Sequence, residues 1–93
     1  MKLRLTELRQ AAEIILSQLA MEGLDEIELT KDYYWSIPKE QRYDPYAKPS
    51  ELTLGQLSDD WKEIHRLVTG EQEAAPYHLE WLSSLLRYVS DQT

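Results

Sequence analysis

The side chains of this chain that could bind a metal ion are few and scattered. Its two histidines, His65 and His78, lie on different predicted helices, and neither has a second ligand at a spacing typical of metal sites. A partly buried imidazole that makes a hydrogen bond is the simpler interpretation of each. The chain contains no cysteine, which removes thiolate ligands and cysteine nucleophiles. The sequence therefore predicts no metal site.

Acid–base and nucleophilic chemistry also lack a suitable group of residues. Asp59, Asp60 and Glu63 are close in sequence, but they fit a solvated helix face near an N-terminus, where negative charge is favoured. No serine stands in a Gly-x-Ser-x-Gly elbow. Ser58 lies inside a predicted helix in the order Leu-Ser-Asp, the reverse of the carrier-protein attachment motif. The three glycines are scattered and form no phosphate-binding loop. We expect no catalytic residue and no cofactor.

The strongest compositional signal is aromatic. Five of the nine aromatic residues fall within fourteen positions, and phenylalanine is absent; the five are Tyr33, Tyr34, Trp35, Tyr43 and Tyr46. Tyr and Trp join a large apolar body to a polar tip, which suits half-exposed sites and protein interfaces. In a strand, Tyr34 points opposite to Tyr33 and Trp35. If those two turn inward, Tyr34 faces solvent or a partner. The alternative is that the rings cover a small core.

These residues supply the candidates for binding a partner, which are Tyr34, Arg42, Tyr43 and Tyr46. The last three belong to a proline-bounded loop, and loops commonly present binding groups on a scaffold. The prolines limit the conformations of the free loop and so reduce the ordering cost of association. Arg42 and two nearby lysines add local positive charge to an acidic protein. The sequence therefore predicts residues 33–46 as the main recognition surface.

The chain carries a net charge of −7, and residues 51–93 hold eight acidic but only three basic groups. Such a surface repels phosphate backbones and anionic lipid, so we expect no nucleic-acid and no membrane partner. A protein partner or self-association is expected instead. No apolar run is long enough to span a membrane, and no signal-peptide pattern follows the basic residues at the start. Together with the lack of cysteine, this favours a cytoplasmic protein.

The first predicted helix covers about residues 5–22. Apolar residues recur on one face at three-four spacing, namely Leu5, Leu8, Ala12, Ile15 and Leu19. Gly23 is placed to end the helix in a left-handed conformation, with Leu24 contacting Leu19. Further apolar residues fall on the opposite side, at Leu3, Ile14 and Met21. A helix that is apolar on two sides is either central or meets a partner.

Residues 25–50 interrupt the helical pattern. Two short runs of alternating apolar residues, 27–30 and 33–37, predict a β-hairpin with its turn at Lys31-Asp32, and one extended strand is the alternative. Three prolines between Pro38 and Ser50 predict an ordered, irregular loop.

Two more helices follow. Thr53 and Gln56 match a capping box at the start of the second helix, which should end at Gly70. Its apolar face is Leu54, Leu57, Trp61, Ile64 and Val68. The third helix should open near Pro76. Its core stripe is predicted to be Leu79, Leu82, Leu85, Leu86 and Val89.

These elements predict a single domain, residues 1–93, of mainly α class with a minor α+β component. The expected architecture is a three-helix bundle with a short β-hairpin or extended segment between the first and second helices. The core is expected to contain Leu57, Trp61 and Ile64. They should pack against Leu8, Ile15 and Leu19 of the first helix and Leu82 and Leu86 of the third.

One sequence pattern resembles that of small uncharacterised bacterial proteins. It consists of Asp32-Tyr33-Tyr34-Trp35 followed by residues 52–61, which read Leu-Thr-Leu-Gly-Gln-Leu-Ser-Asp-Asp-Trp. The resemblance covers about the middle third of the chain. It implies a bacterial cytoplasmic origin and carries no chemistry.

The leading hypothesis for function is a non-enzymatic protein-interaction module, of an accessory, regulatory or immunity type. The alternative is a small-molecule-binding or enzymatic domain whose pocket is lined by the aromatic segment and polar groups such as His65. A helix-turn-helix nucleic-acid binder is disfavoured, because neither the second nor the third helix carries a basic row.

Overall fold

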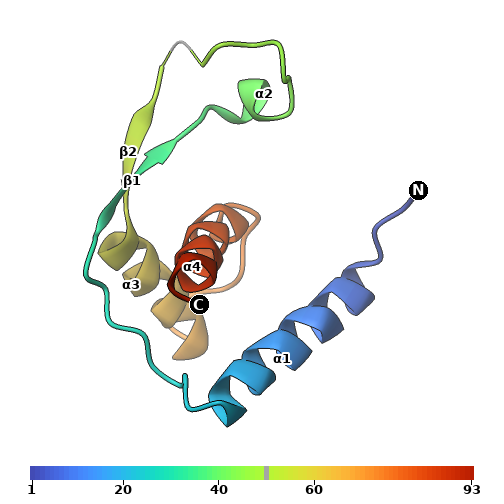
Figure 1. The fold of residues 1–93 in the computed structure, drawn as a ribbon, viewed down its shortest axis with the longest axis vertical. Coiled ribbons are helices and arrows are strands. Elements are labelled where there is room, and N and C mark those ends of the chain that lie inside the picture. Colours follow the sequence, from blue (N-terminus) through green and yellow to red (C-terminus); the bar gives the residue numbers. More distant parts are fainter. Residues whose placement is uncertain (50) are drawn as a thin grey trace.

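A computed structural model describes residues 1–49 and 51–93 of the chain (Figure 1). The elements follow in the order α1 (Leu5–Met21), β1 (Tyr33–Ser36), α2 (Lys39–Arg42), β2 (Thr53–Gln56), α3 (Leu57–Val68) and α4 (His78–Gln92). Three of the helices are long, α2 is a single turn, and the two strands form one small sheet. The predicted mainly α class with minor β structure is confirmed.

The centre of the fold is the pair formed by α3 and α4. Leu57 and Ile64 of α3 and Tyr88 of α4 are buried between them. Two polar side chains, Asp60 and His78, are buried as well. The core is small, because two helices alone cannot enclose many side chains.

Both α1 and α3 end in a Schellman motif, as their glycines predict. Gly23 has a φ of 92°, and the Leu24 amide donates to the Leu19 carbonyl at 2.9 Å. Gly70 has a φ of 78°, and the Glu71 amide donates to the Arg66 carbonyl at 3.0 Å. The predicted ends of these two helices are therefore confirmed.

The strand pairing differs from the predicted hairpin. β1 pairs antiparallel with β2, so that Tyr34 lies opposite Gly55 and Trp35 opposite Leu54. Residues 27–30 form no strand. The predicted capping box is also wrong, because Thr53 begins β2 and α3 begins at Leu57. The α3 N-terminus is capped by Asp32, whose backbone carbonyl accepts the Leu57 amide at 2.7 Å.

The orientation of β1 is the reverse of the one predicted. Tyr33 and Trp35 are each 66% exposed, whereas Tyr34 is half-buried and points toward the helices. The physical reason is Gly55 on the neighbouring strand. A Cβ atom at this position would overlap the Tyr34 ring, so the ring lies over a residue that has no side chain.

The predicted core is only partly correct, because α1 projects away from the α3–α4 pair (Figure 1). Leu57 and Ile64 are buried as expected, but Leu8, Ile15 and Trp61 are 58%, 59% and 49% exposed. On α4, Leu79, Leu82 and Leu86 are also exposed, so the predicted core stripe of this helix is wrong at these three positions. The face of α4 toward α3 instead carries His78, Trp81, Ser84, Leu85 and Tyr88.

Residues 22–32 form the linker between α1 and β1, and hydrogen bonds attach this linker to α4. The Tyr88 hydroxyl donates to the Glu28 carbonyl at 3.1 Å and accepts from the Thr30 amide at 3.1 Å. These bonds hold the linker on α4, while the Schellman motif fixes the chain direction at the end of α1. Within the described residues, no helix has both the length and the apolar character that crossing a membrane requires.

Candidate protein interface

A buried carboxylate joins β1, α3 and α4; we call the part of the chain from β1 to α4 the body. Asp60 of α3 is 6% exposed, and its Oδ2 atom accepts hydrogen bonds from the Tyr34 hydroxyl at 2.6 Å and the Ser84 hydroxyl at 2.5 Å. Burial, followed by the hydrogen bond to Asp60, raises the pKa of Tyr34. The predicted solvated face is therefore wrong for Asp60, although Asp59 remains exposed beside Lys62.

The Asp60 cluster positions elements and does not resemble a nucleophilic site. Ser84 Oγ lies 2.8 Å from the Trp81 carbonyl oxygen as well as contacting Asp60, and no imidazole stands between the serine and the carboxylate. Within residues 1–49 and 51–93 there is also no group of three side chains that could hold a metal ion. The cluster ties β1, α3 and α4 together through charge-assisted hydrogen bonds.

A second carboxylate, Asp32, caps α3 from outside the helix. Its Oδ1 accepts the Ser58 amide at 2.7 Å, and its Oδ2 accepts from the Gln56 side chain and the Ser58 hydroxyl, each at 2.8 Å. The Gln56 hydrogen bond first, and then the Ser58 amide, lower the pKa of Asp32 below its ordinary value of 3.8. A negative charge at the N-terminus of a helix also interacts favourably with the helix dipole.

The lowered pKa of Asp32 predicts an acid-dependent loss of stability. A depressed carboxyl pKa contributes stability that is present above 3.8 and is lost as pH falls through the lower folded-state pKa. Asp32→Asn should therefore reduce the urea midpoint at neutral pH, and its difference from wild type should shrink below pH 3.8. Urea unfolding across pH measures this, with Asp59→Asn as the exposed control. An equal difference at every pH would contradict the capping role.

The two histidines differ in their surroundings. His78 is buried, and its Nδ1 accepts the Ala75 amide at 2.9 Å, which matches the predicted hydrogen-bonded imidazole. His65 is exposed rather than partly buried, with its ring centroid 5.7 Å from that of Trp61. The hollow beside Arg42 is lined by Ser36, Ile37 and Pro38 of the aromatic segment, and the groove beside Trp61 by residues of α1, α3 and α4; neither is lined by His65.

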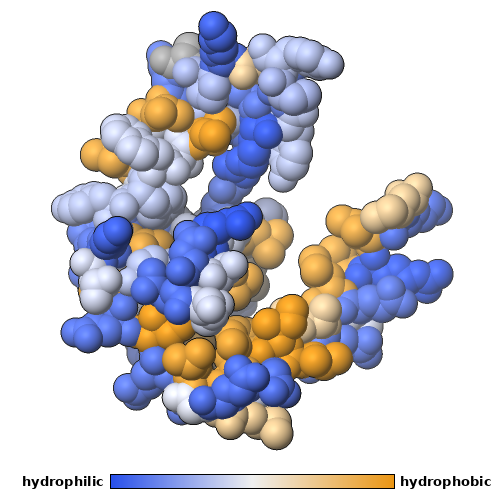
Figure 2. Space-filling view, in the orientation of Figure 1, coloured by the Kyte–Doolittle hydropathy of each residue, from blue (hydrophilic) through white to orange (hydrophobic). Residues whose placement is uncertain are grey.

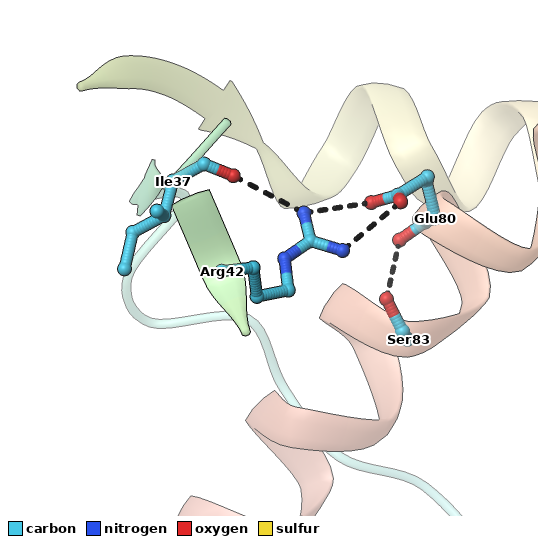
Figure 3. Close-up of polar contacts among 4 residues, drawn as sticks. All are labelled: Ile37, Arg42, Glu80 and Ser83. Atoms are coloured by element: carbon cyan, nitrogen blue, oxygen red, sulfur yellow. Dashed lines mark hydrogen bonds and ion pairs between the residues drawn. The ribbon is translucent and has the colours of Figure 1, made fainter. Parts of the chain in front are cut away.

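The loop that follows β1 is anchored to α4 by Arg42 (Figure 3). The guanidinium contacts the two carboxylate oxygens of Glu80 at 3.1 and 3.4 Å, and donates to the Ile37 carbonyl at 3.2 Å. The hydrogen bond to Glu80 is the main cause that raises the pKa of Arg42 above its ordinary value. This paired, two-point contact makes Arg42 a structural tie within the chain.

The predicted partner-binding residues therefore separate into two groups. Tyr43 and Tyr46 are 85% and 94% exposed on the loop that Arg42 anchors. Tyr34 lies on the inner side of the sheet and is bonded to Asp60. Arg42, Tyr43 and Tyr46 therefore stay on one segment of the chain, and Tyr34 belongs to a different contact. A hollow of about 740 Å³ lies next to Arg42 and is lined also by Tyr77 and Glu80.

A second, largely apolar surface was not predicted from the sequence as a site. Along α1, the residues of the predicted apolar face and Leu16 form what we call the α1 face: Leu5, Leu8, Ala12, Ile15, Leu16 and Leu19. Ala12 and Leu19 are half-buried and the other four are exposed. Figure 2 shows apolar side chains gathered along α1 on the side toward the body, continuing to the base where the helix meets it.

At that base lies a groove of about 610 Å³, which we call the basal groove. Leu16 and Leu19 line it from α1, Trp61 from α3, and Leu85 and Val89 from α4. Apart from Asp25 and Glu26 of the linker, every lining residue is apolar or aromatic. The sequence predicted Leu19, Trp61, Leu85 and Val89 to lie in a closed core, and the one signal for a partner at this surface was the apolar character of two sides of α1.

Comparison with known proteins adds no functional information. No family model, no curated protein and no solved structure matches this chain.

Proposed function

We propose that this chain is a non-enzymatic protein-interaction module that binds through the α1 face and the basal groove. The observation that carries the proposal is the exposure of the α1 face, where Leu5, Leu8, Ile15 and Leu16 lie in solvent. Complete burial of one exposed apolar side chain contributes about 1.5–3 kcal/mol. A partner that covered several of these side chains would therefore form a complex stabilised by several such contributions. Large exposed apolar patches commonly mark interaction sites.

The exposed loop tyrosines support a second contact point for the same partner. Tyr43 and Tyr46 are exposed on a loop that Arg42 ties to α4. Because the loop is already held in place, little conformational entropy would be lost when the two tyrosines bind a partner. An accessory, regulatory or immunity-type role is the kind of function that such a module serves. The lack of cysteine supports a cytoplasmic setting, and the sequence pattern around Trp35 and Trp61 supports a bacterial origin.

The experiment that tests the proposal is affinity capture from the native cell with a matched pair of variants. Leu8→Glu/Ile15→Glu places two charges on the α1 face, whereas Gln10→Glu/Ser17→Glu places the same charges at polar positions that point away from this face. We expect mass spectrometry to find a co-purifying protein, including a second copy, with wild type and Gln10→Glu/Ser17→Glu only. Equal capture by both variants would remove the α1 face from the binding surface.

A second candidate function is the binding of an apolar small molecule in the basal groove. Its volume of about 610 Å³ lies within the range of about 300–1,000 Å³ common for ligand sites. Native mass spectrometry of freshly purified protein tests this candidate, since a retained ligand would add a discrete mass that Trp61→Ala removes. An unmodified mass together with a captured protein would favour the interaction module.

We also expect that the purified protein does not bind duplex DNA at physiological salt. A net charge of −7 offers little counterion release, and the basic Arg42 is already paired with Glu80. Fluorescence anisotropy with labelled duplex across a salt series measures this. Micromolar binding that weakens steeply with salt would contradict the expectation.

A further inference from the structure

The surface area of the chain indicates how much of it a partner should cover. The accessible surface is 8256 Å², whereas a compact monomer of 11.0 kDa is expected to expose about 5,600 Å². The radius of gyration is 15.0 Å, against about 12 Å for a compact domain of this length. The excess of about 2,600 Å² per chain amounts to about 5,300 Å² for two chains, slightly above the range of about 2,000–5,000 Å² that most obligate homodimers bury.

The α3–α4 pair offers an apolar surface that matches the α1 face. Trp61 and Val68 are exposed and recur at helical spacing on α3, next to its buried side. On α4, Leu82 and Leu86 flank Leu85 and Val89, which already line the basal groove. The chain's own α1 reaches only the base of this surface, through Leu16 and Leu19. The rest of the surface has room for a helix.

The chain's own α1 is held away from that position by hydrogen bonds. The Leu24 amide is bonded to the Leu19 carbonyl, and Tyr88 holds the linker at Glu28 and Thr30. Closing α1 onto its own body would require the chain direction to change between Leu24 and Glu28, the two points that these hydrogen bonds hold. With these bonds in place, a helix from another chain could cover the rest of the α3–α4 surface.

Charge also favours a second copy as the source of that helix. Residues 1–10 carry three basic groups and one acidic group, whereas residues 51–93 carry three basic and eight acidic groups. An α1 from another copy would bring its basic N-terminal end, which is also the positive end of the helix dipole, onto an acidic body. The same contact would be made twice around a two-fold axis, as in most homodimers.

We infer that two copies of this chain form a symmetric dimer in which each α1 lies across the α3–α4 pair of the other copy. In this arrangement the N-terminal half of α1 covers Leu82 and Leu86, and the basal groove closes. The inference rests on the proposed function and specifies its partner. In such a dimer, the exposed apolar residues of the α1 face of one copy would complete the small core of the other copy.

Sedimentation equilibrium of the full chain across the micromolar range tests the inference. We expect wild type and Gln10→Glu/Ser17→Glu to have twice the 11.0 kDa chain mass, and Leu8→Glu/Ile15→Glu to lose at least tenfold in dimer affinity. A wild-type chain that stays at the monomer mass would overturn the inference, as would a dimer that tolerates the face variant. If such a monomer still captured a different protein through the α1 face, the proposed function would stand alone.

A cysteine crosslink distinguishes exchange between chains from closure within one chain, and it does not depend on how the glutamate variant folds. Because the chain has no cysteine, Leu8→Cys/Leu82→Cys introduces one defined pair. Mild oxidation should give a covalent dimer, while the control Gln10→Cys/Leu82→Cys should give at least fivefold less. A disulfide within one chain, or equal crosslinking of the control, would contradict the exchanged arrangement.

Discussion

Asp60→Ala should lower the free energy of unfolding by about 3 kcal/mol. The side chain is buried, and its Oδ2 accepts both the Tyr34 and Ser84 hydroxyls. Removing a buried acceptor costs the hydrogen bonds and leaves the donors unsatisfied, at about 1–3 kcal/mol for each group. The three elements that meet at Asp60 would also lose their common contact. Urea unfolding monitored by circular dichroism measures the change.

The matched control for this prediction is the neighbouring residue. Asp59→Ala removes an exposed carboxylate that is 3.9 Å from Lys62, and exposed pairs contribute at most about 1 kcal/mol. A double-mutant cycle with Tyr34→Phe should give a coupling free energy of about 1 kcal/mol or more with Asp60→Ala. Equal losses for Asp59→Ala and Asp60→Ala would show that the buried network does not hold the fold together.

Gly55→Ala should be the most damaging single-methyl change in the sheet, with an expected loss of about 2–3 kcal/mol, the upper part of the range of about 1–3 kcal/mol found for overpacking. The added Cβ would overlap the Tyr34 ring, which lies over Gly55 on its way to Asp60. The ring would have to move, and the Tyr34–Asp60 bond would be lost with it. Thermal and urea unfolding of the variant test the magnitude.

The background Tyr34→Ala separates this clash from other effects of alanine. Without the ring, Gly55→Ala has no large atom to displace, and alanine is in general better suited than glycine to a strand interior. The substitution should then be neutral or slightly stabilising. A loss of the same size in both backgrounds would mean that the backbone of Gly55, and not the ring above it, sets the requirement for glycine.

The three long helices could be predicted from the sequence because their signals are local, whereas the single turn α2 fell in the segment predicted as an irregular loop. The apolar spacing of residues 5–19 and the glycines at 23 and 70 act within one or two turns, and both helix ends appear where expected. The exposure of Tyr43 and Tyr46 also follows from the loop composition. These features depend on neighbours in the sequence and need no knowledge of the rest of the fold.

The features that were missed depend on residues far apart in the chain. The capping-box pattern at Thr53 and Gln56 suits a helix start, but these residues pair with β1 and leave the capping to Asp32, 26 positions before Ser58. The orientation of β1 depends on Gly55 across the sheet. The amphipathic pattern of α1 favours burial of its apolar side, but it does not indicate that this side stays exposed within one chain.

The separation of α1 from the body has a consequence for its helix–coil equilibrium. A helix of 17 residues that stands alone is near the length at which isolated helices are only marginally stable in water. Its helicity should therefore rise and fall with the fraction of chains whose α1 face is covered. The amide hydrogens of α1 should exchange quickly at low protein concentration and slowly at high concentration, while those of α3 and α4 change far less. The α1 helix would then form as it binds, so the free energy of folding this helix would be part of the free energy of binding.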